Sequence, residues 1–235
     1  MELQIAVAKI EKYATSQSGD TVEVVERPNG GISVVMADGQ SSGRGAKWIS
    51  TLVVRKVIAL LADGVRDGAA ARAASDSLFT ERKGKVSATL NIFSVDQQSG
   101  TVVITRNNPA AVLISLDEKI QILDDPCLSV GIYRGTRPLI TEVPIEKGLT
   151  AVMFTDGLIH AGSRYGETMD IITCFQASLE SENPSPQLIA DDLLAYALRL
   201  DQGRPSDDIT VAVLRVMNLS GDNVRRMFVR LPLEP

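Results

Sequence analysis

The sequence predicts an α+β domain, an αββα sandwich in which two antiparallel β-sheets pack on each other and helices cover the outside. Three observations support this fold class. Runs of β-branched and apolar residues alternate with turn sequences over most of the chain, helix-like segments interrupt them in pairs, and no period of about 20–50 residues repeats. Hydrophobic residues make up 44% of the 235 residues, which is enough to fill one core.

The first part of the chain predicts three strands followed by two helices. Its strands show period-two alternation, and Arg27–Gly31 supplies the Pro, Asn and Gly residues of a hairpin turn. After Gly45 apolar residues recur every three or four positions as far as Leu61, which indicates a helix, and we expect Trp48 on its buried face. The expected strands are 2–8, 21–26 and 32–37, and the second helix is 68–78.

The second part predicts mainly strands. Five of them are expected to form an antiparallel meander, at 88–95, 101–105, 111–115, 120–123 and 139–145. Residues 149–155 are almost wholly apolar and predict a central strand buried on both faces. The remaining predicted elements are two helices at 167–179 and 186–200, a strand at 209–216 and a hairpin at 224–231. We take residues 1–216 as one domain and 217–235 as a C-terminal extension that adds an edge strand or docks a partner.

Composition excludes several classes of function. A net charge of −5 and a pI of about 5.0 leave no general basic surface, so nucleic acid is not an expected partner. The longest apolar helical stretch, Leu52–Ala62, contains Arg55 and Lys56 and is far shorter than the ~20 residues of a membrane span. Cys127 and Cys174 lie far apart without metal-like spacing. We therefore expect a cytoplasmic protein with no membrane segment and no zinc site.

Aspartates at the ends of hydrophobic strands are the candidate functional residues. Asp38 and Asp156 each follow an apolar strand and precede a glycine, and Asp207 and Asp208 open another strand. Clustered carboxylates repel one another, and a hard divalent cation such as Mg²⁺ or Mn²⁺ resolves that repulsion. Asp-Gly taken singly is a common turn sequence. The repetition of the pattern at three strands favours a metal site.

Four motifs together resemble a known family. They are Ser18-Gly19-Asp20, Met36–Gly39 continuing through Gly43–Ala46, Phe154–Leu158, and Ser206–Val211. In this order they are similar to metal-dependent protein phosphatases of the PPM/PP2C type, in particular the bacterial sporulation and stress-response branch (SpoIIE, RsbU and stand-alone RsbX-like enzymes). The resemblance covers about residues 2–216 and implies a PP2C-like sandwich.

The resemblance also implies roles for these residues. Asp38 would bridge two divalent cations, Mn²⁺ or Mg²⁺; Asp20 and the Gly39 carbonyl would serve the second cation, and Asp156 and Asp207 the first. The pair would activate a water for attack on phosphoserine or phosphothreonine, with Asp38 and Asp156 as catalytic residues. Asp208 would support the ligands, and Arg44 is the nearest candidate phosphate contact. The implied substrate is a phosphorylated STAS-domain protein, an anti-sigma antagonist or a stressosome component.

Three positions depart from the family pattern. Ser41 stands where the family usually has glycine, His160 stands where this branch is commonly acidic, and no arginine before Asp20 matches the phosphate-binding arginine of eukaryotic relatives. The sole histidine, His160, is expected at the start of a loop without a chemical role, although its position four residues after Asp156 could put it at the rim of a metal cleft.

Two alternatives remain open at this point. Gly39–Gly43 matches Gly-x-Ser-x-Gly, so Ser41 could be the nucleophile of an α/β-hydrolase, although only His160 could complete a triad. The second alternative is a catalytically silent module of the same fold that binds a phosphoprotein. Activity that depends on added metal would favour the phosphatase over both.

Overall fold

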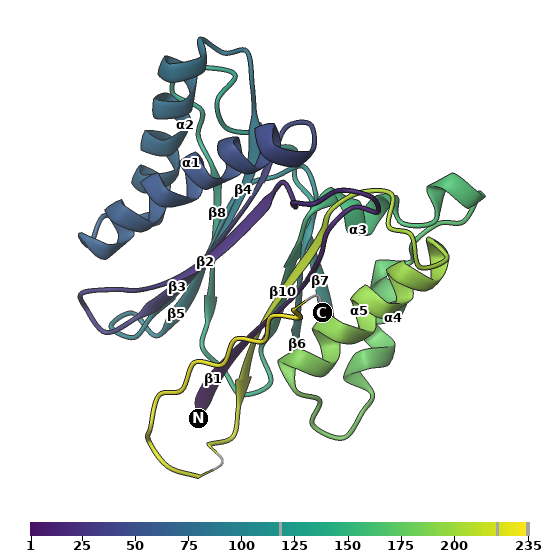
Figure 1. The fold of residues 1–235 in the computed structure, drawn as a ribbon. Helices are drawn as coiled ribbons and strands as arrows, with labels where there is room; N and C mark the ends of the chain where they lie inside the picture. The colour runs from purple at the N-terminus through teal and green to yellow at the C-terminus, as the bar shows by residue number, and fades with distance from the viewer. Residues whose placement is uncertain (118, 220, 234–235) are drawn as a thin grey trace.

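The computed structural model describes residues 1–117, 119–219 and 221–233 and shows two five-stranded sheets in which every strand pair is antiparallel (Figure 1). One sheet has the order β1 (Glu2–Ile10), β10 (Ile209–Met217), β9 (Thr150–Phe154), β6 (Val112–Leu116) and β7 (Lys119–Leu123). The other has the order β2 (Asp20–Glu26), β3 (Ile32–Gly39), β4 (Ala88–Asp96), β5 (Thr101–Asn107) and β8 (Leu139–Pro144).

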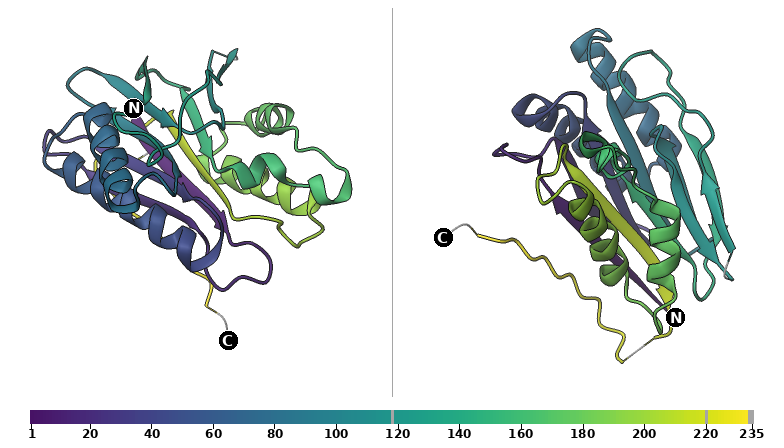
Figure 2. Two further views of the ribbon diagram at one scale, coloured as in Figure 1. Left: turned by 90° about the horizontal axis from the view of Figure 1, so that it is seen from above. Right: turned by 90° about the vertical axis from the view of Figure 1, so that its right-hand side faces the viewer.

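Helices cover the outer face of each sheet, as Figures 1 and 2 show. The β2–β8 sheet carries α1 (Gly43–Ala62) and α2 (Asp67–Arg82). The β1–β7 sheet carries α4 (Ile171–Leu179) and α5 (Pro186–Leu200). A short helix, α3 (Asp156–His160), follows β9 after Thr155. The predicted αββα sandwich is therefore confirmed, and within the described residues no helix is long and apolar enough to cross a membrane.

Three layers of apolar side chains hold the sandwich together. The middle layer lies between the sheets and includes Met36 and Phe93 from one sheet and Met153 and Leu214 from the other. Each outer layer joins one sheet to its helices. The predicted central strand is confirmed: β9 lies in the middle of its sheet, and all five of its residues are buried.

The inner face of α1 differs from the expectation at Trp48. The residues that pack on the sheet follow the stripe Ala46, Ile49, Val53 and Val57. Trp48 lies beside this stripe, is 40% exposed, and stacks under the guanidinium of Arg82, 4.1 Å from the ring centre. The expectation that Trp48 belongs to the core was wrong, because a helical repeat of three and four residues covers two neighbouring stripes.

The expected meander is also corrected. β4 and β5 pair in one sheet, whereas β6 and β7 pair in the other, and β8 returns to β5. The chain changes sheets just after β5, where Asn108 accepts a hydrogen bond from the Ala110 N–H (2.9 Å) and donates one to the Phe154 carbonyl (3.2 Å). Apolar side chains of β5 and β6 both enter the layer between the sheets, so the hydrophobic pattern does not distinguish their sheets.

The helix predicted at 167–179 begins later, at Ile171. Residues 163–165 form a short 3-10 turn, and α4 starts at Ile171. Asp170 caps it, because its Oδ1 accepts a hydrogen bond from the Thr173 N–H (3.0 Å). An N-cap aspartate fixes a helix start by satisfying a free backbone donor.

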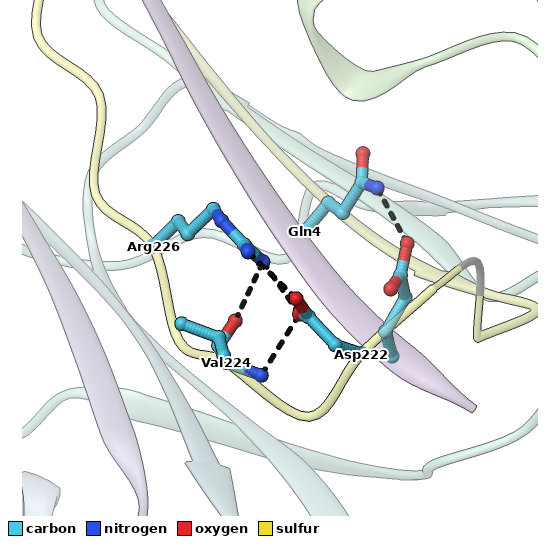
Figure 3. Close-up of polar contacts among 5 residues, drawn as sticks. Gln4, Asp222, Val224 and Arg226 are labelled. Carbon is cyan, nitrogen blue, oxygen red and sulfur yellow. Dashed lines mark hydrogen bonds and ion pairs between the residues drawn. The ribbon is translucent and has the colours of Figure 1, made fainter.

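The C-terminal residues 221–233 contain no strand, so the hairpin and edge strand expected there are not formed. They run along the outside of the molecule, and Phe228 is 89% exposed (Figure 2). Local polar contacts shape the segment: Asp222 accepts from the Val224 N–H (3.1 Å) and pairs with Arg226 (2.6 Å), as Figure 3 shows. Alternation alone predicted a strand here, but residues 221–233 form no ladder with either sheet.

Candidate active site

Acidic residues from four segments gather at one end of the two sheets. Asp20 begins β2 and stands opposite Asp38, its register partner near the end of β3. Asp156 follows β9 as the first residue of α3, and Asp207 comes just before β10, the antiparallel neighbour of β9. Antiparallel pairing places the end of one strand beside the start of the next. Each sheet therefore brings two of the aspartates to this end.

Asp20 joins the two sheets there. Its side chain is fully buried, and its Oδ2 accepts hydrogen bonds from Thr155 Oγ1 (3.0 Å) and Thr210 Oγ1 (2.5 Å), which belong to the other sheet and its continuation. Burial raises the pKa of Asp20, although the two threonines and Lys9 oppose the increase. The other oxygen, Oδ1, is buried and has no hydrogen-bond partner within the described residues. Such an atom is costly unless a proton or a cation satisfies it.

Asp38 shows that the four carboxylates act on one another. Its pKa is raised to about 9, first by burial and then by the negative charges of Asp20, Asp156 and Asp207. Burial also raises the pKa of Asp207, and the charge of Asp156 adds to that effect. Since charge–charge effects of this size need short separations, the four side chains form one acidic cluster.

The cluster fits a hard divalent cation in its donor chemistry. All of its donors are oxygens, which Mg²⁺ and Mn²⁺ prefer, and a cation would satisfy Asp20 Oδ1 and remove the repulsion that raises the pKa of Asp38. Over residues 1–117, 119–219 and 221–233, however, no three His, Cys, Asp or Glu side chains are already arranged to hold a metal ion. The site is therefore a set of suitable donors that must adjust around an ion.

Asp208 anchors the loop that carries Asp20. It is buried, and its two carboxylate oxygens accept hydrogen bonds from the backbone N–H groups of Lys12 (2.9 Å) and Gly19 (2.7 Å). Its own N–H donates to Asp207 Oδ1 (3.0 Å). These contacts connect the start of β10 to the β1–β2 loop, so Asp208 positions the neighbouring acids through the backbone.

Gly39 and Gly157 serve close packing of the backbone. A Cβ at Gly39 would lie 2.0 Å from the Ala46 carbonyl oxygen, and one at Gly157 would lie 2.1 Å from the Asp208 carbonyl oxygen. Both distances are impossible for real side chains. The glycine after each of these two aspartates therefore allows another backbone segment to pack against it. The sequence had suggested only that glycine lets the backbone come close to an ion.

Two lysines that sequence reasoning missed lie at the cluster. Lys9 Nζ and Lys47 Nζ each donate to the backbone carbonyl of Asp20 at 2.7 Å, and Lys47 also donates to Thr21 Oγ1 (3.0 Å). Burial lowers the pKa of Lys47, and the charge of Lys9 lowers it further. The position of Lys47 in the sequence could have indicated this contact, because Lys47 lies in the first turns of the helix that follows Asp38.

The remaining candidates lie around the cluster. Arg44 is exposed in the first turn of α1, and His160 is exposed at the end of α3. Ser41 is exposed and has a left-handed φ of 86° between β3 and α1. Both sheets are antiparallel, whereas the α/β-hydrolase expectation for Ser41 needs a mostly parallel sheet. No hydrogen bond within the described part of the chain joins Ser41 to His160.

Comparison with known proteins identifies the family. The sequence model of the SpoIIE family (stage II sporulation protein E) matches residues 28–217. The chain belongs to the SpoIIE family. Curated relatives include stage II sporulation protein E of Bacillus subtilis (strain 168), 22% identical over 199 residues, and that of Priestia megaterium, 21% identical over 212 residues. The alignments cover 85% and 90% of this chain but 24% and 36% of those proteins, so the chain spans only about a quarter to a third of their length.

Solved structures show that this SpoIIE-family chain has the PP2C phosphatase fold. The PP2C phosphatase domain of SpoIIE from Bacillus subtilis, with a fragment of its regulatory domain, has a TM-score of 0.79 and 20% identity; the match covers 94% of this chain and 64% of that one. The catalytic domain of the serine/threonine phosphatase PstP with two manganese ions has a TM-score of 0.69 and 18% identity, covering 92% and 99%. RsbX with magnesium has a TM-score of 0.67 and 15% identity, covering 90% and 94%. The predicted family and fold are confirmed.

Proposed function

We propose that this chain is a metal-dependent serine/threonine protein phosphatase that hydrolyses phosphoserine or phosphothreonine on a signalling protein. The observation that carries the proposal is the acidic cluster: four aspartates from both sheets, with the pKa of Asp38 raised to about 9 and a buried Asp20 oxygen without a partner. Membership of the SpoIIE family and the PP2C fold support it.

Different residues of the cluster would hold each of two cations. Asp38, whose pKa responds to each of the other three carboxylates, would help to hold both cations. Asp20 and the Gly39 carbonyl would hold one cation, and Asp156 and Asp207 the other. Asp208 would keep this set in place through the backbone of Gly19.

Phosphate-ester hydrolysis here needs charge neutralisation and positioning more than a protein nucleophile. When bound, two divalent cations, Mn²⁺ or Mg²⁺, would neutralise phosphate charge and lower the pKa of a water molecule. The water would lose one proton as its oxygen forms a bond to phosphorus, the ester P–O bond would break on the opposite side, and the departing serine or threonine oxygen would gain one proton, so the overall reaction balances. The protein residues orient this arrangement and do not form a covalent bond to phosphorus.

The substrate that we propose is a phosphorylated STAS-domain protein, either an anti-sigma antagonist or a stressosome component, in the cytoplasm. Two similarities support this choice: the family match to a sporulation protein and the fold shared with RsbX. The proposal includes a role in stress signalling, with residues 1–216 as the phosphatase domain and residues 217–235 as an extension.

The test is hydrolysis of phosphoserine and phosphothreonine peptides and of an aryl phosphate, each with Mn²⁺, with Mg²⁺ and with EDTA. We expect turnover only with added metal. Asp38→Asn should reduce it by several orders of magnitude, whereas the matched change Asp124→Asn, at an exposed residue after β7, should not. Turnover that persists in EDTA, or that Asp38→Asn leaves intact, would refute the mechanism.

One observation favours a second candidate, a catalytically silent phosphoprotein-binding module. The described side chains do not form a finished metal cage. A folded wild-type protein that binds phosphoprotein but shows no turnover at any Mn²⁺ concentration would establish this alternative.

A further inference from the structure

A groove of about 680 Å³ lies on the surface formed by α1, with Ser77 of α2 at its side. The groove is lined by α1 residues that include Arg44, Trp48, Thr51 and Arg55. These residues are three or four positions apart in sequence, so they lie on one face of the helix and form one stripe. This stripe is distinct from the one that packs on the sheet.

The charge of this groove is opposite to that of the chain. Four ionisable residues line it, namely Arg44, Lys47, Arg55 and Lys56, and all are basic, although the net charge of the chain is −5. Within the part of the chain that the structure describes, none of the four forms an ion pair. No acidic residue lines the groove, so the mutual repulsion of Arg44, Arg55 and Lys56 favours an anionic partner there.

Trp48 provides an aromatic surface in the middle of this stripe. It is 40% exposed, although large aromatic side chains are usually well buried, and Arg82 stacks on its ring. Tryptophan and arginine are enriched where proteins bind partners. The groove therefore combines cationic groups with an apolar contact, as a peptide-binding surface requires.

One end of the groove lies close to the backbone of Asp20. Lys47, one of its lining residues, donates to the Asp20 carbonyl, and α1 begins four residues after Gly39. From Arg44 to Ala59, the last α1 residue of the lining, the helix advances by about 22 Å. An extended peptide covers that distance with about seven residues.

We propose that this groove binds an acidic segment of the phosphoprotein substrate, about seven residues long, which runs along α1 away from the phosphorylated residue. The inference rests on the proposed phosphatase function and adds the substrate class that the enzyme selects. Acidic side chains would pair with Arg55 and Lys56, while the phosphorylated residue lies at the acidic cluster. A long nucleic acid fits less well, because four basic side chains on a chain of net charge −5 offer few phosphate contacts.

Binding can be measured without catalysis, because Trp48 is the only tryptophan of the chain. The probe is an unphosphorylated peptide of alternating Glu and Ser, compared with a peptide of alternating Lys and Ser. We expect the acidic peptide alone to change Trp48 fluorescence, and the change to weaken at high salt. Arg55→Glu/Lys56→Glu should abolish it, Arg55→Gln/Lys56→Gln should give an intermediate response, and Lys119→Glu/Lys147→Glu, with the same charge change elsewhere, should respond like the wild type.

Specificity is measured by the ratio of kcat/KM for a phosphopeptide with the acidic extension to that for the same phosphopeptide without it. Extensions are tested on both sides of the phosphorylated residue. We expect an advantage of about tenfold from pairing with several exposed cations. In Arg55→Glu/Lys56→Glu the ratio should fall below one, and a basic extension should recover the advantage.

The outcomes separate this inference from the proposed function. If neither phosphopeptide is hydrolysed, the phosphatase proposal fails, while the fluorescence response still decides whether the groove binds acidic peptide. If both are hydrolysed equally and Trp48 does not respond, the groove proposal fails and the phosphatase proposal stands. A response to anionic vesicles or to polynucleotide but not to the acidic peptide would also overturn it.

Discussion

Replacing Asp38 by asparagine should stabilise the metal-free protein at neutral pH and flatten the dependence of its stability on pH. In the folded chain the pKa of Asp38 is raised from 3.8 to about 9, mainly by burial and by Asp20. Below pH 3.8 both states carry the proton, so the contribution of Asp38 to stability is fully present there. As the pH rises toward 9, the unfolded chain ionises and the folded one does not, so the free energy of unfolding falls.

The size of this effect follows from the two pKa values. Each pH unit between them lowers the free energy of unfolding by about 1.4 kcal/mol, which amounts to about 4 kcal/mol at pH 7. Asparagine cannot ionise, so this loss is absent from the variant. Its amide would also be able to donate a hydrogen bond to the neighbouring Asp20 carboxylate.

The assay is urea unfolding in EDTA, followed by circular dichroism at pH values from about 5 to about 8. The stability advantage of Asp38→Asn over the wild type should grow with pH, whereas Asp124→Asn should run parallel to the wild type. Parallel curves for Asp38→Asn and the wild type would show that Asp38 is ionised in the metal-free fold, which would contradict the raised pKa of Asp38 in the acidic cluster.

Three further predictions concern the metal, the anchoring aspartate and the serine. The melting temperature of the wild type should rise with Mn²⁺ concentration, since a ligand at about 100 times its Kd adds about 2.7 kcal/mol to the free energy of unfolding. Asp38→Asn should reduce this rise. A wild-type melting temperature that millimolar Mn²⁺ does not change would contradict the metal site. Asp208→Ala should lower the free energy of unfolding in urea by about 3 kcal/mol, because Lys12 and Gly19 lose the acceptors of their N–H groups, and a negligible loss would contradict the anchoring role. Ser41→Ala should keep most of the metal-dependent activity, and labelling of Ser41 by a fluorophosphonate together with loss of activity would favour a hydrolase.

The acids were predictable from sequence because strand ends constrain them. Asp38 is the penultimate residue of β3, and Asp156 comes two residues after β9, so both carboxylates lie at an end of a sheet. Pairing of consecutive strands brings Asp20 opposite Asp38. The two threonines that hold Asp20 were not predicted, since they come from the other sheet. Their contacts depend on how the sheets are stacked, which local alternation does not encode.

Other differences have a similar origin. The period of the hydrophobic residues distinguishes a strand from a helix, but it does not show which strand pairs with which. We therefore expected β6 and β7 in the sheet that contains β4, β5 and β8, whereas they belong to the other sheet. Trp48 was expected inside because its stripe runs beside the buried one, although the charges of Arg55 and Lys56 on the same side indicate an outward face. The extension at 221–233 alternates like a strand, but alternation does not provide a partner edge.

The placement of the two lysines explains how the acidic cluster can exist and still remain available to a cation. Lys9 and Lys47 contact the carbonyl of Asp20 and not its carboxylate, and the charge of Lys9 opposes the rise in the pKa of Asp20 without occupying Oδ1. A direct salt bridge would satisfy that oxygen and compete with a metal ion. Within the described residues none of the cluster's carboxylates is in an ion pair. The repulsion is therefore reduced but not removed, and a divalent cation bound at the cluster would relieve the part that remains.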